Sequence, residues 1–167
     1  MDNKPLLHAK TQAALTAFDI AHEVLECDPD LADTAAFVEH YGFTLDQSAN
    51  TILVASKKVE PTKYAVCVVL GTTKLDVNKA VCKLLGVKRA SFASGEETIK
   101  LTDMMIGGVT AIGIEDLPIY IDAAVMRPSQ VIMGGGNRSS KLLLDPVELK
   151  KLPNAQVIDD LAKPKEQ

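Results

Sequence analysis

The sequence predicts an α/β (α+β) fold: a single domain in which helices pack on one mixed, partly curled β-sheet. At 167 residues the chain is long enough for one domain that buries about two-thirds of its unfolded surface. Short apolar segments typical of strands alternate with segments of helical periodicity, without repeats or low complexity. We expect the domain to span residues 1–162 and the polar tail, 163–167, to be disordered.

Patterns in the first half of the chain predict two helices and three strands. Apolar residues recur with helical spacing over 7–18. Asp33 or Thr34 can cap a second helix that runs through Tyr41, and Gly42 is placed to end it. The segment YAVCVVLG is apolar almost throughout, which is typical of a strand buried on both faces. The predicted strands are HEVLEC, ILVAS and YAVCVVLG, the last two joined by the turn KKVEPTK.

The second half predicts further helices between short strands. Asp76 precedes VNKAVCKLLG, a helical segment that Gly86 closes. Ser94 and Glu97 form the capping box of another helix, which continues toward Thr102. The remaining predicted elements are strands at RASFAS, LPIYIDAAV, QVIMGGG and SKLLLD, and a capped helix start at DPVELKKL.

Composition excludes several classes of protein. The chain is 47% hydrophobic and 24% charged, and no apolar run approaches the ~20 residues needed to span a bilayer. The N-terminal segment MDNKPLLHAK lacks the apolar core of an export signal. Three cysteines without CxxC or Cys–His spacing fit reduced thiols better than a disulfide framework or a zinc site. We therefore expect a cytoplasmic protein with no membrane association, no metal and no cofactor.

Charge is spread unevenly along the chain. The net charge is −4, but the first 50 residues carry nine acids and two bases, whereas residues 51–100 carry nine bases and four acids. A local basic patch of this kind is enough to grip a short piece of a polyanion. Lys79 and Lys83 lie one helical turn apart within this segment. The alternative is that they form an ordinary solvated helix face.

Familiar catalytic motifs are absent. The sequence has no G-x-S-x-G, no P-loop and no dinucleotide fingerprint, and its three histidines lack metal-ligand spacing. The unusual features are two glycine clusters, GGVTAIG at 107–113 and GGGNRS at 134–139, with Asp122 between them. Because only short strands separate the clusters, both could line one mouth of a sheet.

The order of segments resembles the YbaK/EbsC family of aminoacyl-tRNA deacylases, which includes the editing domain of bacterial prolyl-tRNA synthetases. The segments that carry the resemblance, from about Thr11 to Ala162, are SANTILV, LDVNKAVCKLLGVKRASFASGEETIKLT, IGGVTAIG, IYIDAAVM, GGGNRSSKLLL and DPVELKKLPNAQVIDDLA. The resemblance implies a highly curved mixed sheet. It also implies hydrolysis of the ester that joins a wrong amino acid to the 3′ end of a tRNA, without a metal or a covalent nucleophile.

The resemblance further implies a site. The family's G-x-x-x-P loop matches Gly107, Gly108, Val109, Thr110 and Ala111, whose backbone would hold the aminoacyl group and the ribose. Glycines there would let the substrate approach N–H and C=O groups closely, and fixed donors would stabilise an oxyanion. Asp122 matches the aspartate of a family strand, as a catalytic residue at the pocket mouth; the alternative is an edge-strand carboxylate that faces water. Further substrate contacts are expected from the matched positions Thr51, Gly134, Gly135, Gly136 and Arg138, although Arg138 could instead pair with a neighbouring carboxylate.

Two positions depart from the family pattern. Ala111 replaces the proline of the loop, and Asn50 occupies the place of the functional lysine that opens a family strand. Asparagine can hydrogen-bond but carries no charge. Asn50 is thus a candidate catalytic residue or a simple turn residue, and Lys57, Lys58 or Lys63 could supply the missing charge.

These observations favour a free-standing editing hydrolase that releases the amino acid from mischarged tRNA, with the ribose hydroxyl assisting the attacking water. Its partners would be the acceptor end of tRNA, bound through Lys79 and Lys83, and possibly a synthetase. Two alternatives remain open: a non-catalytic module that binds aminoacyl-tRNA or a nucleotide, favoured by Asn50, and an esterase of small aminoacyl-like substrates.

Overall fold

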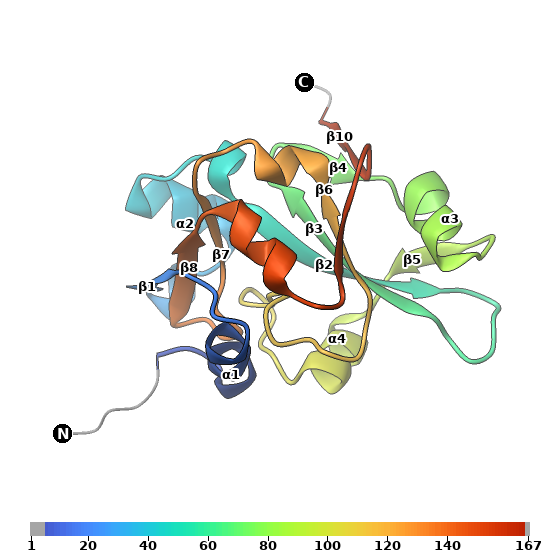
Figure 1. Cartoon of the computed structure of the whole chain (residues 1–167), viewed down its shortest axis with the longest axis horizontal. Helices are drawn as coiled ribbons and strands as arrows, with labels where there is room; N and C mark the ends of the chain where they lie inside the picture. Colours follow the sequence, from blue (N-terminus) through green and yellow to red (C-terminus); the bar gives the residue numbers. More distant parts are fainter. Residues whose placement is uncertain (1–5, 166–167) are drawn as a thin grey trace.

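The computed structural model describes residues 6–165, which form three β-sheets with helices around them (Figure 1). The largest sheet has five strands in the order β5-β2-β3-β6-β9, and a three-stranded antiparallel sheet has the order β1-β8-β7. A third sheet pairs β4 with β10. The strand bounds are β1 Glu23–Glu26, β2 Ala49–Ser56, β3 Tyr64–Leu70, β4 Thr73–Leu75, β5 Ala90–Phe92, β6 Ile119–Asp122, β7 Val131–Gly134, β8 Ser140–Leu144, β9 Ala155–Ile158 and β10 Ala162–Pro164.

The α-helices are α1 Ala9–Ala17, α2 Thr34–Tyr41, α3 Cys82–Leu85 and α4 Gly95–Thr102. Capping residues predicted the end of α2 and the start of α4, whereas the Asp33 side chain makes no capping hydrogen bond to α2. Gly42 ends α2 in the left-handed conformation, with φ of 78°. Ser94 and Glu97 form both halves of the predicted capping box at the start of α4. Short 3-10 segments lie at Pro29–Leu31, Leu45–Gln47, Ala123–Met126 and Pro146–Lys151.

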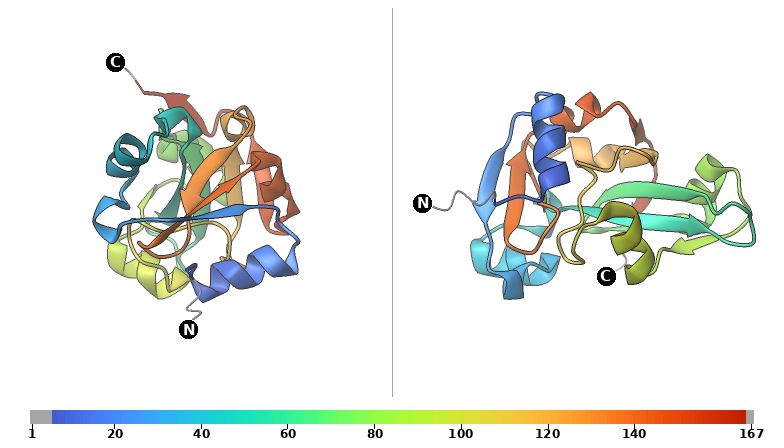
Figure 2. Two further views of the ribbon diagram at one scale, coloured as in Figure 1. Left: turned by 90° about the vertical axis from the view of Figure 1, so that its left-hand side faces the viewer. Right: turned by 90° about the horizontal axis from the view of Figure 1, so that it is seen from below.

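Strands β2 and β3 form the long antiparallel hairpin that organises the molecule, and it reaches out from the body at its turn (Figure 2). On the other side of β3, β6 and then β9 are added in parallel. Val66 and Val68 of β3 pack on one face of the sheet, whereas Cys67 and Val69 pack on the other. The prediction that this apolar strand is buried on both faces is confirmed.

Each face of the five-stranded sheet has its own apolar core. The larger core joins β2, β3 and β6 to α1 and to the three-stranded sheet. The second core lies between the opposite face and α3, and it includes Leu161 near the C-terminus. A smaller cluster around Phe37 fixes α2 beside β7.

Several features differ from the sequence-based expectation. The helix predicted after Asp76 begins with a π-helical segment, Val77–Val81, before it continues as α3. The predicted single sheet is divided, and a lone bridge between Ser48 and Ile132 connects its two larger parts. Strands β4, β9 and β10 were not predicted. Lys163 and Pro164 belong to β10, so this part of the expected disordered tail is ordered, while residues 166–167 lie outside the described residues.

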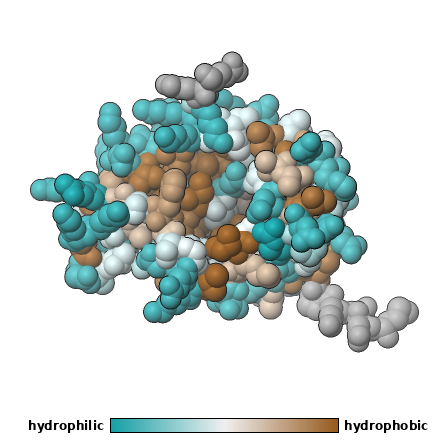
Figure 3. Space-filling model, turned by 180° about the vertical axis from the view of Figure 1, so that it is seen from behind, coloured by the Kyte–Doolittle hydropathy of each residue, from teal (hydrophilic) through white to brown (hydrophobic). Residues whose placement is uncertain are grey.

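On the face opposite to that of Figure 1, apolar residues gather in an area bordered by hydrophilic side chains (Figure 3). The large apolar residues that are exposed on the molecule include Phe92 and Ile106, which are 59% and 48% exposed. Within residues 6–165, no helix has the length and apolar character required to cross a membrane.

Candidate active site

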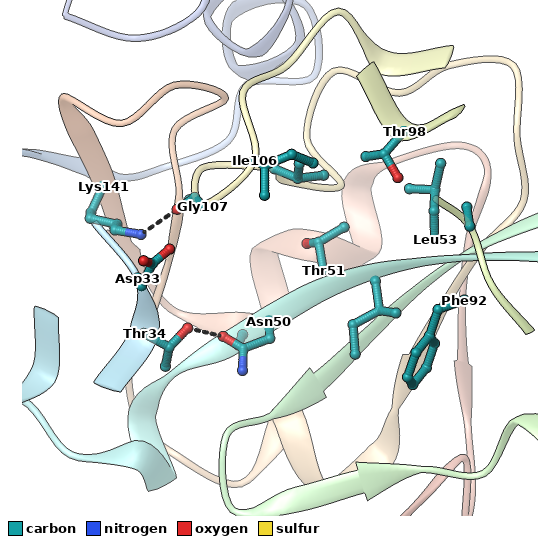
Figure 4. A pocket seen from close by; sticks show the side chains of 15 residues that line it. Asp33, Thr34, Asn50, Thr51, Leu53, Phe92, Thr98, Ile106, Gly107 and Lys141 are labelled. Carbon is teal, nitrogen blue, oxygen red and sulfur yellow. Dashed lines mark hydrogen bonds between the residues drawn. The ribbon is translucent and has the colours of Figure 1, made fainter. Parts of the chain in front are cut away.

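A cavity of about 280 Å³ lies over the start of β2, between the N-terminus of α2 and the loop that follows α4. Its polar residues lie mainly at one end, near Lys141 and Asp33, while Leu53 and Phe92 lie at the other (Figure 4). The cavity is lined by Asp33, Thr34, Ala49, Asn50, Thr51, Ile52, Leu53, Phe92, Ala93, Thr98, Ile106, Gly107, Val109, Gly134 and Lys141. We refer to it as the Asn50 pocket.

Strand β2 contributes two neighbouring polar residues that connect the walls of the pocket. Oδ1 of Asn50 accepts a hydrogen bond from Oγ1 of Thr34 at 2.9 Å, which joins the strand to the first residue of α2. Oγ1 of Thr51 accepts a hydrogen bond from the N–H of Ala111 at 3.1 Å, which joins the strand to the glycine loop. Asn50 and Thr51, both expected at the site, thus line this pocket, and Asn50 is a residue of strand β2 rather than a turn residue.

Lys141 of β8 is one of the pocket residues that the sequence did not indicate as part of the site, as is Asp33. The Lys141 side chain is 6% exposed, and Nζ donates to the carbonyl oxygens of Ala32 at 2.7 Å and Gly107 at 3.2 Å. Nζ also lies 5.4 Å from the centre of the Phe37 ring, within range of a cation–π contact. Burial lowers the pKa of the Lys141 ammonium below the ordinary lysine value of 10.5. The only signal in the sequence was a lysine inside an otherwise apolar strand.

The lysines proposed from the sequence as substitutes for the family lysine lie elsewhere. Nζ of Lys63 donates to the carbonyl oxygen of Leu85 at 3.2 Å, in the region of α3. Lys57 and Lys58 are exposed and follow the end of β2 away from the pocket. That prediction is wrong, and Lys141 is the lysine that lines the same cavity as Asn50.

The two glycine clusters lie against each other. A Cβ atom at Gly108 would overlap the backbone of Asn137, and one at Gly134 would lie 2.5 Å from the carbonyl oxygen of Gly108. The N–H of Gly136 donates to that same oxygen at 2.7 Å. The predicted reason for the glycines was close approach of substrate, but in the structure their missing side chains allow the two loops to pack together.

Only some of the glycine-loop residues that were predicted to contact substrate line the cavity. Gly107, with φ of 91°, Val109 and Gly134 line the pocket. Thr110 and Ala111 are fully buried behind the loop and do not line the cavity, so their predicted contact with substrate is wrong in placement. Gly108, predicted as catalytic, does not line the cavity, and neither do Thr110, Ala111, Gly135 and Gly136, which were predicted to bind substrate.

Arg138 holds the pocket wall together from outside. Its Nη1 donates to Oδ1 of Asp33 and to the carbonyl oxygen of Ile106, both at 3.1 Å. Its Nε donates to the carbonyl oxygen of Pro29 at 2.9 Å. Of the two predicted roles, the structure supports pairing with a neighbouring carboxylate, because these contacts connect α2 to the glycine loop.

Asp122 lies in a different region. It is 3% exposed at the end of β6 and borders a separate cavity of about 420 Å³ with Arg127 and Asp159. Burial raises the pKa of the Asp122 carboxyl, and hydrogen bonds from the backbone of Leu161 and Ala162 partly oppose that rise. The predicted placement of Asp122 at the mouth of the pocket is wrong, since its side chain instead holds the C-terminal segment.

The remaining predicted contacts do not enter the Asn50 pocket. Lys79 lies on the π-helical segment and Lys83 on α3, and both side chains are exposed. Among residues 6–165, no group of three or more histidine, cysteine, aspartate or glutamate side chains could hold a metal ion. The polar groups that line the Asn50 pocket include the side chains of Lys141, Asp33, Asn50 and Thr51, beside the backbone of Gly107 and Val109.

Comparisons with known proteins agree with this architecture. A family model described as "Aminoacyl-tRNA editing domain" matches residues 28–152, so the chain belongs to that family. The structure of hypothetical protein APE2540 has a TM-score of 0.81 and 21% identity, covering 92% of this chain and 99% of that one. The structure of "a putative trans-editing enzyme for prolyl tRNA synthetase" has a TM-score of 0.77 and 26% identity, covering 96% and 99% of the two chains.

Proposed function

We propose that this protein hydrolyses the ester bond of mischarged aminoacyl-tRNA and acts as a free-standing editing enzyme. The observation that carries the proposal is the buried Lys141 ammonium in the Asn50 pocket of an aminoacyl-tRNA editing domain. A lysine side chain thus lines the pocket although asparagine stands at position 50. The family membership gives the substrate class, and the contacts of the pocket supply a mechanism.

Lys141 would stabilise the charge that develops on the ester oxygen. An ammonium has three N–H donors, and the hydrogen bonds to Ala32 and Gly107 use two of them. The third would bind the carbonyl oxygen of the ester and strengthen as that oxygen becomes negative. The hydrogen bonds found among residues 6–165 include none donated by the backbone N–H groups of Gly107 and Val109, which line the same pocket and could add to this stabilisation.

Asp33 would bind the α-ammonium group of the amino acid. Its side chain is 71% exposed at the edge of the pocket, and although Asp33 precedes α2, its carboxylate does not cap the helix. Arg138 holds one of its oxygens at 3.1 Å, which orients the carboxylate. A water molecule then attacks the ester carbon, the bond to the ribose oxygen breaks, and the products are the free amino acid and a tRNA with a free hydroxyl.

The size of the pocket favours small amino acids. Its volume of about 280 Å³ lies just below the range of about 300–1,000 Å³ that is usual for small-molecule sites. The terminal ribose has to share this space with the side chain of the amino acid. Selection by size is weak, at about 1–3 kcal/mol per methylene, so we expect release of more than one small residue.

The test is a set of tRNAs charged with alanine, cysteine, serine or threonine and mixed with a substoichiometric amount of protein. We expect release of at least one of these amino acids over several turnovers. N-acetylation of the amino acid should reduce the rate, because it removes the positive charge that Asp33 would bind. Binding of tRNA without release from any of the four would contradict hydrolysis and support the non-catalytic alternative.

A further inference from the structure

A second and larger cavity, of about 920 Å³, is bordered by strand β5 and shares Phe92 with the Asn50 pocket. One wall is formed by β4 and β10 with the start of the π-helical segment, and the other by β5. Its lining residues are Lys74, Leu75, Asp76, Val77, Asn78, Ala90, Ser91, Phe92, Lys163, Pro164 and Lys165. We call it the lysine groove.

The groove carries positive charge that the protein itself leaves uncompensated. Lys74 and Lys163 are directly opposite each other in the antiparallel pair of β4 and β10. Like charges in this arrangement destabilise a sheet. Lys165 lies two residues beyond Lys163 and lines the same groove, and all three lysines are exposed.

Neighbouring acids do not offset these lysines. Asp76 is the only acidic residue that lines the groove, and its Oδ1 accepts a hydrogen bond from the backbone N–H of Lys79 at 3.1 Å. None of the three lysines takes part in an ion pair within the part of the chain that the structure describes. An arrangement that costs stability in the free protein is explained if an anion binds between the lysines.

Phe92 connects the groove to the pocket. This residue ends β5, its side chain is 59% exposed, and it lines both cavities. An exposed aromatic ring beside a lysine-lined groove is the usual arrangement in proteins that bind single-stranded nucleic acid, where the ring stacks on a base and the lysines bind phosphates.

We infer that the lysine groove binds the phosphate backbone of a single-stranded RNA end, with a base stacked on Phe92 and the terminal ribose in the Asn50 pocket. The inference rests on the proposed function, since the acceptor end of tRNA is such a strand. It is an alternative to the surface predicted from the sequence, since Lys79 and Lys83 line neither cavity.

The variant Lys163→Glu distinguishes RNA binding by the lysine groove from a purely structural role of its lysines. The new carboxylate would face Lys74, so the substitution should raise the midpoint of thermal unfolding while it weakens binding of a short single-stranded RNA by about tenfold or more. The slope of log affinity against log salt should become shallower by about 0.7 per lost phosphate contact. Lys79→Glu, with the same change of charge outside the groove, is the matched control and should have a much smaller effect.

Deacylation provides the second readout. Lys163→Glu should lower kcat/KM for a full-length mischarged tRNA and leave the rate on an aminoacyl-adenosine ester unchanged, because that ester has no preceding phosphates. Unchanged RNA affinity in Lys163→Glu, or an equal loss in Lys79→Glu, would overturn the inference. If the unsubstituted protein released no amino acid from either ester, the proposed function would fail, while the RNA-binding measurement would still decide on the groove.

Discussion

Two regions of this molecule each contain a charged side chain that is almost fully buried. Lys141 is 6% exposed in the wall of the Asn50 pocket, and Asp122 is 3% exposed at the end of β6. Burial shifts the pKa of both toward the neutral form, downward for Lys141 and upward for Asp122. Burial and a shifted pKa therefore do not by themselves distinguish a site from a structural contact.

The partners of the two charges differ. Asp122 accepts backbone hydrogen bonds from Ala123 next to it and from Leu161 and Ala162 of the C-terminal segment. Lys141 has three donors and two carbonyl acceptors, and its ammonium borders a cavity with Asp33 and Asn50. A buried charge becomes a candidate for chemistry when one of its hydrogen-bonding positions is directed to a space that a ligand can enter.

The largest effect is expected from Lys141→Met, which keeps an unbranched side chain but removes the ammonium. Loss of one donor to a developing oxyanion costs about 2.7–4 kcal/mol, so deacylation should fall by about 10²- to 10³-fold. Single-turnover release from the best mischarged tRNA measures this, with thermal unfolding as the folding control. Activity within about twofold of the unsubstituted protein would make Lys141 a purely structural residue.

The pH dependence should sharpen the same comparison. Deacylation should decline as pH rises and the Lys141 ammonium loses its proton. Because burial lowers the pKa of Lys141, this decline should begin below pH 10.5, and the rate should then fall by about tenfold for each further unit of increasing pH. In the window between the lowered pKa and 10.5 the unfolded chain binds more protons than the folded one, so stability should rise with pH while activity falls. Both trends should be absent in Lys141→Met after subtraction of spontaneous hydrolysis.

A smaller effect is expected from Asn50→Ala. The substitution removes the hydrogen bond from Thr34 and a polar group from the pocket, and one such bond contributes about 0.5–1.5 kcal/mol. Turnover should fall by about two- to tenfold, with the fold retained. Unchanged turnover in a stopped-flow or quenched assay would show that Asn50 only connects β2 to α2.

The smallest effect on deacylation is expected from Asp122→Asn, the matched change at the other buried charge. Turnover should remain within about twofold, because Asp122 does not line the Asn50 pocket. Its raised pKa makes the folded protein bind more protons than the unfolded chain between 3.8 and the raised value, so stability falls as pH rises through that window. Asp122→Asn should remove this fall. A large loss of turnover at unchanged stability would restore Asp122 as a catalytic residue.

Local signals in the sequence predicted most helices and strands. The capping box at Ser94 and the glycine at Gly42 depend on neighbours within one turn, so the sequence alone was sufficient. Strands β4, β9 and β10 are formed by pairing with distant segments, and their sequences TKL, AQVI and AKP show neither a long apolar run nor strict alternation. Their short patterns were not distinguishable from loops.

The site was predicted less well for a related reason. Asn50, Thr51, Gly107 and Gly134 could be placed from motifs, but Lys141 meets its acceptor Ala32 across 109 positions of sequence. Periodicity and spacing in a sequence do not indicate contacts between residues so far apart in the chain. The same limit led to the misplacement of Asp122, since a resemblance in sequence order does not say which face of a sheet a side chain takes.

The most direct test of the account moves the lysine from one wall of the pocket to the other. Lys141→Met should nearly abolish deacylation, and the double variant Asn50→Lys with Lys141→Met should recover a large part of it, because the new lysine would return a cation to the cavity from β2. Asn50→Lys alone should not exceed the unsubstituted protein, since two ammonium groups in one cavity repel each other. Single-turnover rates of all four proteins on one mischarged tRNA, with matched unfolding midpoints, decide the matter. Recovery in the double variant is the predicted result, and full activity in Lys141→Met alone would contradict the central role of Lys141.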